Sequence, residues 1–270
     1  MTNPEWLRLV SDYQRALMRL FRGRLLDLMA HPEIADNVRF REATDGIAYR
    51  MAAQVAKANV GTWRGAMMRL TNSREMHRLI QSEIANGGYG PELEALARRN
   101  AHLIRSLPQE ISRMATQRAT KMVAESGRAG EMERFLRSLV PDVAKSRIKL
   151  IARTEVSRAN TDLTQARSER LGIEWYQWAT SEDQRVRPSH RNMDNVLVRW
   201  SDPASPEALI GEKSTLGHYT PGSCPQCRCL PLPLASIDEV RWPARMYMNG
   251  SIRRTSRAEF TRLIGIQIAA

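Results

Sequence analysis

The sequence has few cysteines, few aromatic residues and no long apolar run. Only 3 of its 270 residues are cysteines, and aromatic residues make up 6%. No apolar stretch approaches the roughly 20 residues that a membrane-spanning helix needs, so we expect no association with a membrane. The first residues lack a basic segment followed by an apolar one, so we expect no signal peptide and a soluble protein made in a cytoplasm.

The three cysteines all lie within the stretch from Cys224 to Cys229. Because their number is odd, a complete set of disulfides within one chain is excluded. Close clustering without a secretory signal favours a metal site in a reducing compartment over a disulfide framework.

Acidic residues are the minority among the charged side chains. The chain has 41 Lys and Arg against 29 Asp and Glu, a net charge of +12. Residues 1–150 hold 25 basic and 16 acidic side chains, residues 151–236 hold 10 of each, and residues 237–270 hold 6 and 3. Arginine pairs bidentately with phosphate oxygens, so this excess suits contact with nucleic acid. A solvated helical surface explains the same charge, and both interpretations stay open.

Apolar residues recur at helical spacing through the first half of the chain, and no strand pattern occurs there. Prolines and glycines are expected to end the helices, because proline lacks a backbone donor and glycine favours left-handed caps. The predicted helices span residues 6–29, 41–70, 76–84, 91–107, 109–126, 131–140 and 141–171.

After Gly172 the pattern changes to the alternation of strands, with predicted strands at 173–179 and 196–200. The proline-containing segment 230–234 is extended but cannot be a central strand. The predicted fold class is α+β, with a short antiparallel sheet and a Cys/His cluster. Its three regions are a basic helical region (1–140), a small α+β module (141–235) and a basic C-terminal tail (236–270) with a final helix at 257–268.

Cys224, Cys227 and Cys229 have a spacing that lets thiolates of one turn face the same ion. Zinc binds four N or S ligands, so one histidine would complete the site. His190 is our first candidate and His218 the alternative. Three thiolates favour a structural zinc ion over a catalytic one, and a reduced cysteine cluster without metal is the other interpretation.

His190 and Asp194 also permit a hydrolytic interpretation, in which a metal-dependent hydrolase or nuclease acts through them and Glu155. We favour a structural role for Asp194, since Asp is typical of the tight turn that precedes the second strand. For Glu155 we predict an ion pair with Arg185 or Arg187, which would hold the loop between the two strands.

Several short motifs follow one another between residues 145 and 235. Their residues are Arg153, Thr154, Glu155, Trp178, Asp183, Arg185, Arg187, His190, Asp194, Cys227 and Cys229. The order of these motifs resembles the phage Mu F-like head morphogenesis family, the minor head proteins of tailed phages. The sequence departs from the family pattern in having Asn195 where glycine is usual and an additional Cys224.

The resemblance implies a minor capsid protein that is made in the host cytoplasm and incorporated into the virion at the portal vertex. Its expected partners are the portal protein, packaged DNA, and the major capsid or scaffolding protein. It would act in head assembly, DNA packaging or DNA ejection. The family has no established enzymatic activity, so we expect this chain not to be an enzyme.

Overall fold

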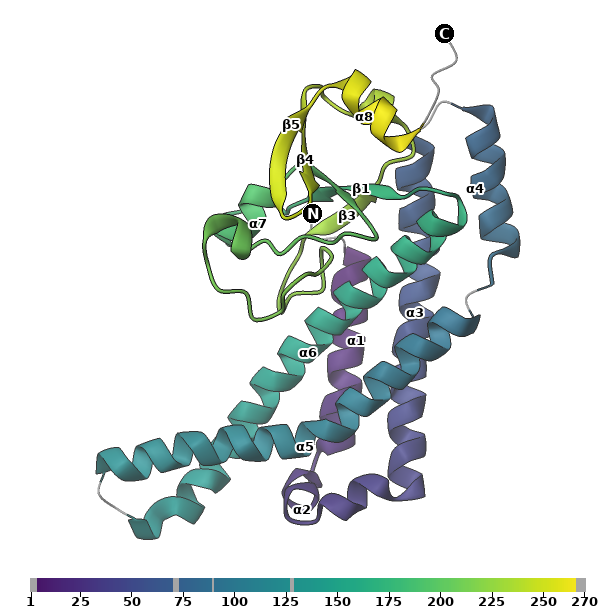
Figure 1. The fold of residues 1–270 in the computed structure, drawn as a ribbon. Helices are drawn as coiled ribbons and strands as arrows, with labels where there is room; N and C mark the ends of the chain where they lie inside the picture. Colours follow the sequence, from purple (N-terminus) through teal and green to yellow (C-terminus); the bar gives the residue numbers. More distant parts are fainter. Residues whose placement is uncertain (1–3, 70–72, 89, 127–128, 266–270) are drawn as a thin grey trace. The chain divides into compact units, whose positions relative to one another are not determined.

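A computed structural model describes residues 4–69, 73–88, 90–126 and 129–265, and Figure 1 draws the path of the chain. The described residues form eight α-helices and one five-stranded sheet, which confirms the predicted α+β class. The helices are α1 (Pro4–Phe21), α2 (Leu25–Ala30), α3 (Val38–Arg69), α4 (Arg74–Asn86), α5 (Gly90–Ser126), α6 (Met132–Arg170), α7 (Pro188–Met193) and α8 (Arg257–Ile264). The strands are β1 (Trp175–Ala179), β2 (Val196–Arg199), β3 (Leu230–Pro233), β4 (Ala244–Met248) and β5 (Ser251–Thr255).

The chain divides into two compact units. We call Thr2–Val55 with Gly90–Val156 the helical unit, and Ala56–Tyr89 with Ser157–Ala270 the sheet unit. Helices α3 and α6 each contribute residues to both. The predicted domain boundaries at residues 140 and 235 would separate regions that each fold independently. The division into two compact units does not test this, so these boundaries stay predictions.

Two helices of the helical unit pass through prolines that we expected to end them. Helix α5 continues across Pro108, and α6 continues across Pro141. Proline inside a helix costs about 3 kcal/mol, because it removes a hydrogen bond and clashes with a carbonyl. The apolar stripe of α5 runs on through Ile104, Leu107 and Ile111, all fully buried, and that burial offsets the cost.

The first predicted helix, 6–29, is wrong as a single element. The structure has α1 and α2 in its place, separated at Gly23, whose φ of 70° lies in the left-handed region. A helix interior does not accommodate that conformation, and glycine adopts it without a steric penalty. The glycine, rather than the later Pro32, therefore ends α1.

The sheet has the strand order β3-β1-β2-β4-β5. β1 pairs antiparallel with β2 and β3, and β4 pairs antiparallel with β5, but β2 and β4 run parallel. The sheet is therefore mixed rather than purely antiparallel as predicted. β3 lies at an edge, as its prolines require. β4 and β5 were not predicted, and they place part of the expected tail in the sheet (Figure 1).

The sheet buries side chains on both faces. Trp175 and Leu197 pack on one face with Phe260 of α8, whose ring lies 5.1 Å from that of Trp175 in an edge-on arrangement. Tyr176 and Trp178 point to the opposite face, because side chains alternate along a strand. This second face carries the three cysteines, and we call it the cysteine face.

A buried polar network holds α3, α4 and α6 together in the sheet unit. Arg167 is 1% exposed, donates from Nε to Asn59 Oδ1 at 3.1 Å and lies over the ring of Trp63. Its Nη1 lies 3.7 Å from Glu83 Oε1, which also accepts a hydrogen bond from Arg170 at 2.9 Å. Burial lowers the pKa of Arg167 to about 10, against the opposing attraction of Glu83. The guanidinium stays charged at neutral pH, so its charge must be paired inside the unit.

Replacing Arg167 with alanine should destabilise the chain strongly. The change removes the buried partner of the Asn59 side-chain oxygen and one of the two arginines that pair with Glu83. Removing one partner of a buried ion pair typically costs about 3–5 kcal/mol. Urea denaturation measures the loss in the free energy of unfolding. Arg170→Ala is the matched control, because Arg170 also pairs with Glu83 but has a side chain that is 29% exposed. Equal losses in the free energy of unfolding would contradict the claim that the buried contacts of Arg167 stabilise the unit more than the partly exposed pair of Arg170.

Candidate metal centre

His190 is brought to the cysteine face by a short helix. Pro188 occupies the first turn of α7, where its fixed φ and missing N–H suit a helix start. The third residue of this helix is His190, which is 2% exposed and meets the ring of Trp178 edge-on at 5.6 Å. Strand β1 and helix α7 together therefore fix both the depth and the direction of the imidazole.

The cysteine loop, residues 218–229, is held against α6. Thr161 Oγ1 donates to the carbonyl of Pro221 at 2.7 Å. Gly222 follows with φ of 85°, and a Cβ there would lie 2.9 Å from Thr161 Oγ1 and 3.2 Å from the Ser157 carbonyl. Only glycine fits this close approach without a shift. The contact sets the position of the cysteines that follow.

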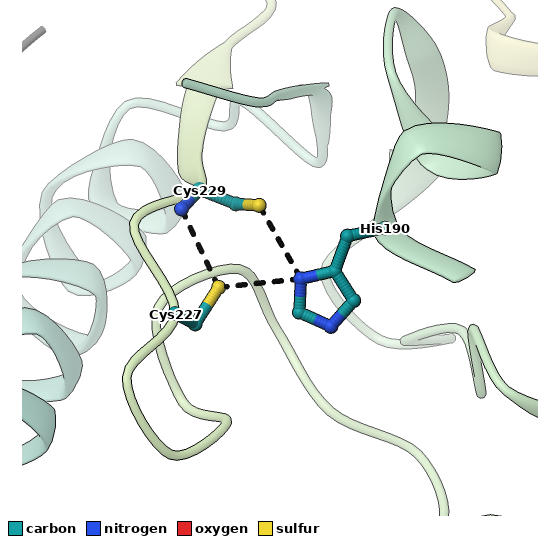
Figure 2. A group of neighbouring side chains, drawn as sticks. All are labelled: His190, Cys227 and Cys229. Carbon is teal, nitrogen blue, oxygen red and sulfur yellow. Dashed lines mark hydrogen bonds between the residues drawn. The ribbon is translucent and has the colours of Figure 1, made fainter. Parts of the chain in front are cut away.

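Three ligand atoms meet where the loop and α7 face each other (Figure 2). His190 Nδ1 lies 3.5 Å from the sulfur of Cys227 and 3.4 Å from that of Cys229. In a tetrahedral zinc site, ordinary Zn–S and Zn–N bond lengths separate sulfur and nitrogen by about 3.5 Å. The measured separations match that value, so these three groups fit one tetrahedral ion.

The protonation states of the group favour a negative charge at Cys227. A hydrogen bond from Cys229 and the nearby His190 lower the pKa of the Cys227 thiol to about 4, although burial opposes this. The pKa of Cys229 is raised by its bond to Cys227 and by burial. Burial lowers the pKa of His190, but Cys224 and Cys227 outweigh it and raise the value to about 9. The thiolate is the form of cysteine that binds metal, whereas the protonated imidazole of His190 must lose a proton before it can bind an ion.

The other nitrogen of His190 is oriented by a chain of hydrogen bonds. His190 Nε2 lies 2.9 Å from Tyr219 Oη, and that hydroxyl donates to Glu207 Oε1 at 2.6 Å. Glu207 also accepts from Ser214 at 3.2 Å. With its hydroxyl proton given to Glu207, Tyr219 can only accept from His190, which directs Nδ1 to the sulfurs. Outer partners of this kind fix the tautomer of metal-binding histidines.

Cys224 and His218 have different positions relative to this group. Cys224 is buried beside His190, and Arg187 donates to its sulfur and, at 2.7 Å, to the carbonyl of Pro225. Within the described residues the close group consists of His190, Cys227 and Cys229, so Cys224 lies at its border. His218 lies outside the group, and its Nδ1 bonds the carbonyl of Pro203 at 2.7 Å.

The segment from Asp183 to His190 is joined to the cysteine loop by charged side chains. Arg228 stands between two of the cysteines and forms a bidentate ion pair with Asp183, with one N–O distance of 2.6 Å. The Arg228 hydrogen bond lowers the pKa of Asp183 to about 2. Asp183 also accepts from the backbone of Arg185 at 2.9 Å. The segment from Asp183 to His190 therefore binds the cysteine loop at three points: Asp183 to Arg228, Arg187 to Cys224, and His190 to the last two sulfurs.

Asp194 occupies the turn before β2. Its Oδ1 accepts hydrogen bonds from the backbone and hydroxyl of Thr180 at 2.9 and 2.8 Å. Asn195 adopts φ of 60° and donates its backbone N–H to the carbonyl of Trp178. These contacts agree with the structural interpretation of Asp194, and Asn195 takes the left-handed conformation that glycine usually supplies.

Arg153 and Glu155 lie in the helical unit. The guanidinium of Arg153 stands 5.6 Å over the ring of Trp6. Glu155 is buried, with an oxygen 3.8 Å from Arg99 Nε. The predicted pairing of Glu155 with Arg185 or Arg187 joins residues of the two units, and it stays a prediction.

Sequence reasoning missed four residues that shape the centre. Tyr219, Glu207, Arg228 and Gly222 each act through a contact distant in sequence. A glycine directly after Pro221 was the only local signal, because it is typical of a turn that needs a left-handed residue.

Replacing Gly222 with alanine should loosen the cysteine loop from α6. The left-handed backbone conformation alone costs alanine about 1–3 kcal/mol, and the close contact with Thr161 adds to that cost. Gly217→Ala is the matched control, because that residue has φ of 68° and open space around its Cβ. Thermal unfolding should show a larger drop in Tm for the Gly222 variant. A drop no larger than that of the control would contradict the role of the contact.

The residues of this centre lie within the part of the chain that is similar to known proteins. The family model described as "Phage Mu protein F like protein" matches residues 66–231. An uncharacterized protein of Haemophilus influenzae is 29% identical over 151 residues, which are 55% of this chain. The match spans 30% of the length of that relative. No solved structure is significantly similar to the chain.

The family match begins at residue 66, well before the motifs of residues 145–235 that carry the resemblance. It includes the end of α3, all of α4 and α5, and the whole interlocked centre from Asp183 to Cys229. None of the described helices has the length and apolarity of a membrane span. The family suggests a head morphogenesis protein and a place in the virion. The chain belongs to the phage Mu F-like family.

Proposed function

We propose that this chain is a minor head protein that binds the portal protein at the portal vertex, and that its Cys/His centre is structural rather than catalytic. Family membership supports the role in head morphogenesis. The burial of the centre carries the structural assignment. His190, Cys227 and Cys229 are at most 5% exposed, so their ligand atoms are largely shielded from water and from a substrate.

The centre would hold one zinc ion. Cys227, Cys229 and Nδ1 of His190 supply three ligands, and a rotation of the Cys224 side chain would supply the fourth. Three thiolates and a neutral imidazole give the zinc complex a net negative charge, and the guanidinium of Arg187 beside Cys224 would balance it. Zinc would tie the loop to α7 and stabilise the sheet unit, as structural zinc does in small domains.

The enzymatic alternative has weaker support. A hydrolase acting through His190 and Asp194 needs the carboxylate to orient the imidazole, yet Asp194 accepts two hydrogen bonds from Thr180. The partner that orients His190 is Tyr219. We therefore propose that the chain is not an enzyme. DNA cleavage by the purified protein that is lost specifically on Asp194→Ala would reverse this conclusion.

Metal analysis of the full chain tests the centre. The purified protein should contain about one zinc ion per chain, in keeping with a closed four-ligand site. Cys227→Ser, Cys229→Ser and His190→Ala should each release zinc and lower Tm. Tyr219→Phe should keep the fold and weaken zinc binding by about 10- to 100-fold, because it removes only the hydroxyl that orients His190.

His218→Ala is the control for these variants, since His218 lies outside the close group. It should keep both zinc and Tm. Loss of zinc in this variant, with zinc retained in His190→Ala, would make His218 the ligand. Absence of zinc from the wild-type protein, with unchanged Tm in both cysteine variants, would remove the metal from the proposal.

Co-expression with the portal protein tests the proposed role. The chain should co-purify with portal protein, and a phage that lacks it should assemble heads defective in DNA packaging or ejection. Major capsid and scaffolding proteins, co-expressed one at a time, test the remaining expected partners. Intact infectious heads formed without the chain would contradict a role in morphogenesis.

A further inference from the structure

A polar pocket lies on the cysteine face, and none of the residues that line it is a ligand of the proposed metal centre. It has a volume of about 570 Å³ and opens between the β4–β5 hairpin, α7 and the short helix at Ala208–Ile210. Asn192, Leu209, Arg245 and Arg254 line it, together with the turn between the two strands. Its lining includes three arginines and no acidic side chain.

Two of these arginines oppose each other across the hairpin. Arg245 and Arg254 are directly paired in the register of β4 and β5, so their side chains leave the same face of the sheet. The neighbouring pair of the same face, Tyr247 and Ile252, packs on the cysteine face. Like charges directly opposite each other destabilise a pair of strands. A negative charge between the two guanidinium groups would therefore relieve the repulsion.

The described residues supply no such charge. Arg245 donates to the amide oxygen of Asn192 at 2.8 Å, which orients the guanidinium without neutralising it. Neither Arg245 nor Arg254 has a described carboxylate within ion-pair distance, whereas Arg199 and Arg257 of the same unit pair with Glu174 and Asp238. Within the described part of the chain, Arg245 and Arg254 are thus two positive charges without a paired carboxylate, whereas the third arginine of the lining, Arg253, is attracted by Glu259.

We propose that this pocket binds a phosphate group, and that the phosphate belongs to the backbone of DNA. Two guanidinium forks on one face can grip the oxygens of a single phosphate, which is the geometry that arginine favours. Arg254 is exposed, so an extended polymer can reach it from solvent. The phosphate site rests on this geometry alone, while the choice of DNA as its source rests on the proposed function in the phage head.

Binding of a short labelled DNA duplex by the full chain, measured by fluorescence anisotropy over a series of salt concentrations, tests the proposal. Arg254→Gln should weaken binding and lower the slope of log K against log salt by about 1, because one phosphate contact is lost. Arg254→Lys keeps the charge but loses the guanidinium fork, so it should keep a salt slope close to that of the wild type and bind with an affinity between those of the wild type and Arg254→Gln. Arg199→Gln is the matched control, since it removes an arginine that Glu174 already neutralises.

Each outcome decides a separate point. An Arg254→Gln variant with the wild-type slope and affinity would overturn the site. A calorimetric titration with inorganic phosphate tests whether the pocket binds free phosphate instead of a phosphate of the DNA backbone. If phosphate binds and DNA does not, the site stands and DNA is overturned as its ligand; if neither binds, both are overturned. If the wild-type chain binds DNA normally but does not co-purify with portal protein, the result counts against the proposed function and not against the phosphate site.

Discussion

The contact of His190 with the sulfurs of Cys227 and Cys229 is the interaction on which the sheet unit depends. An imidazole and thiols buried together must share protons or a metal ion, because an unpaired buried polar group is costly. Every neighbouring feature serves this pairing. Gly222 allows the cysteine loop to approach α6, and Tyr219 turns Nδ1 of His190 toward the sulfurs.

The charged residues of the motif explain why two distant segments belong together. Asp183 pairs with Arg228 and Arg187 pairs with Cys224, so each segment satisfies groups of the other. A second polar network around Arg167 performs the same task for α3, α4 and α6. The unit is thus held at two places by buried polar contacts, and the sheet packs apolar side chains on both of its faces.

The features that were predicted correctly from the sequence depend on the local backbone, and features that depend on contacts between distant residues were not predicted. The end of α6 at Gly172 and the edge position of β3 were predictable, because they depend on the backbone conformations of glycine and proline themselves. Pro108 was wrongly expected to end a helix, because burial of the apolar stripe around it outweighs its local cost. Strand β5 was missed because Arg253 and Arg254, next to each other, break the apolar alternation that marks a strand. In β4 the alternation of Ala244, Met246 and Met248 is masked by the apolar Tyr247 between them.

By itself, the sequence determined the α+β class, the family resemblance and the set of residue types that can bind zinc. Those follow from spacing, composition and the order of motifs, which are properties of the chain alone. Tertiary structure decided that His190 rather than His218 meets the sulfurs, and that Arg245 and Arg254 oppose each other. Both results depend on strand register and on the path of loops, which arise from contacts between residues far apart in sequence.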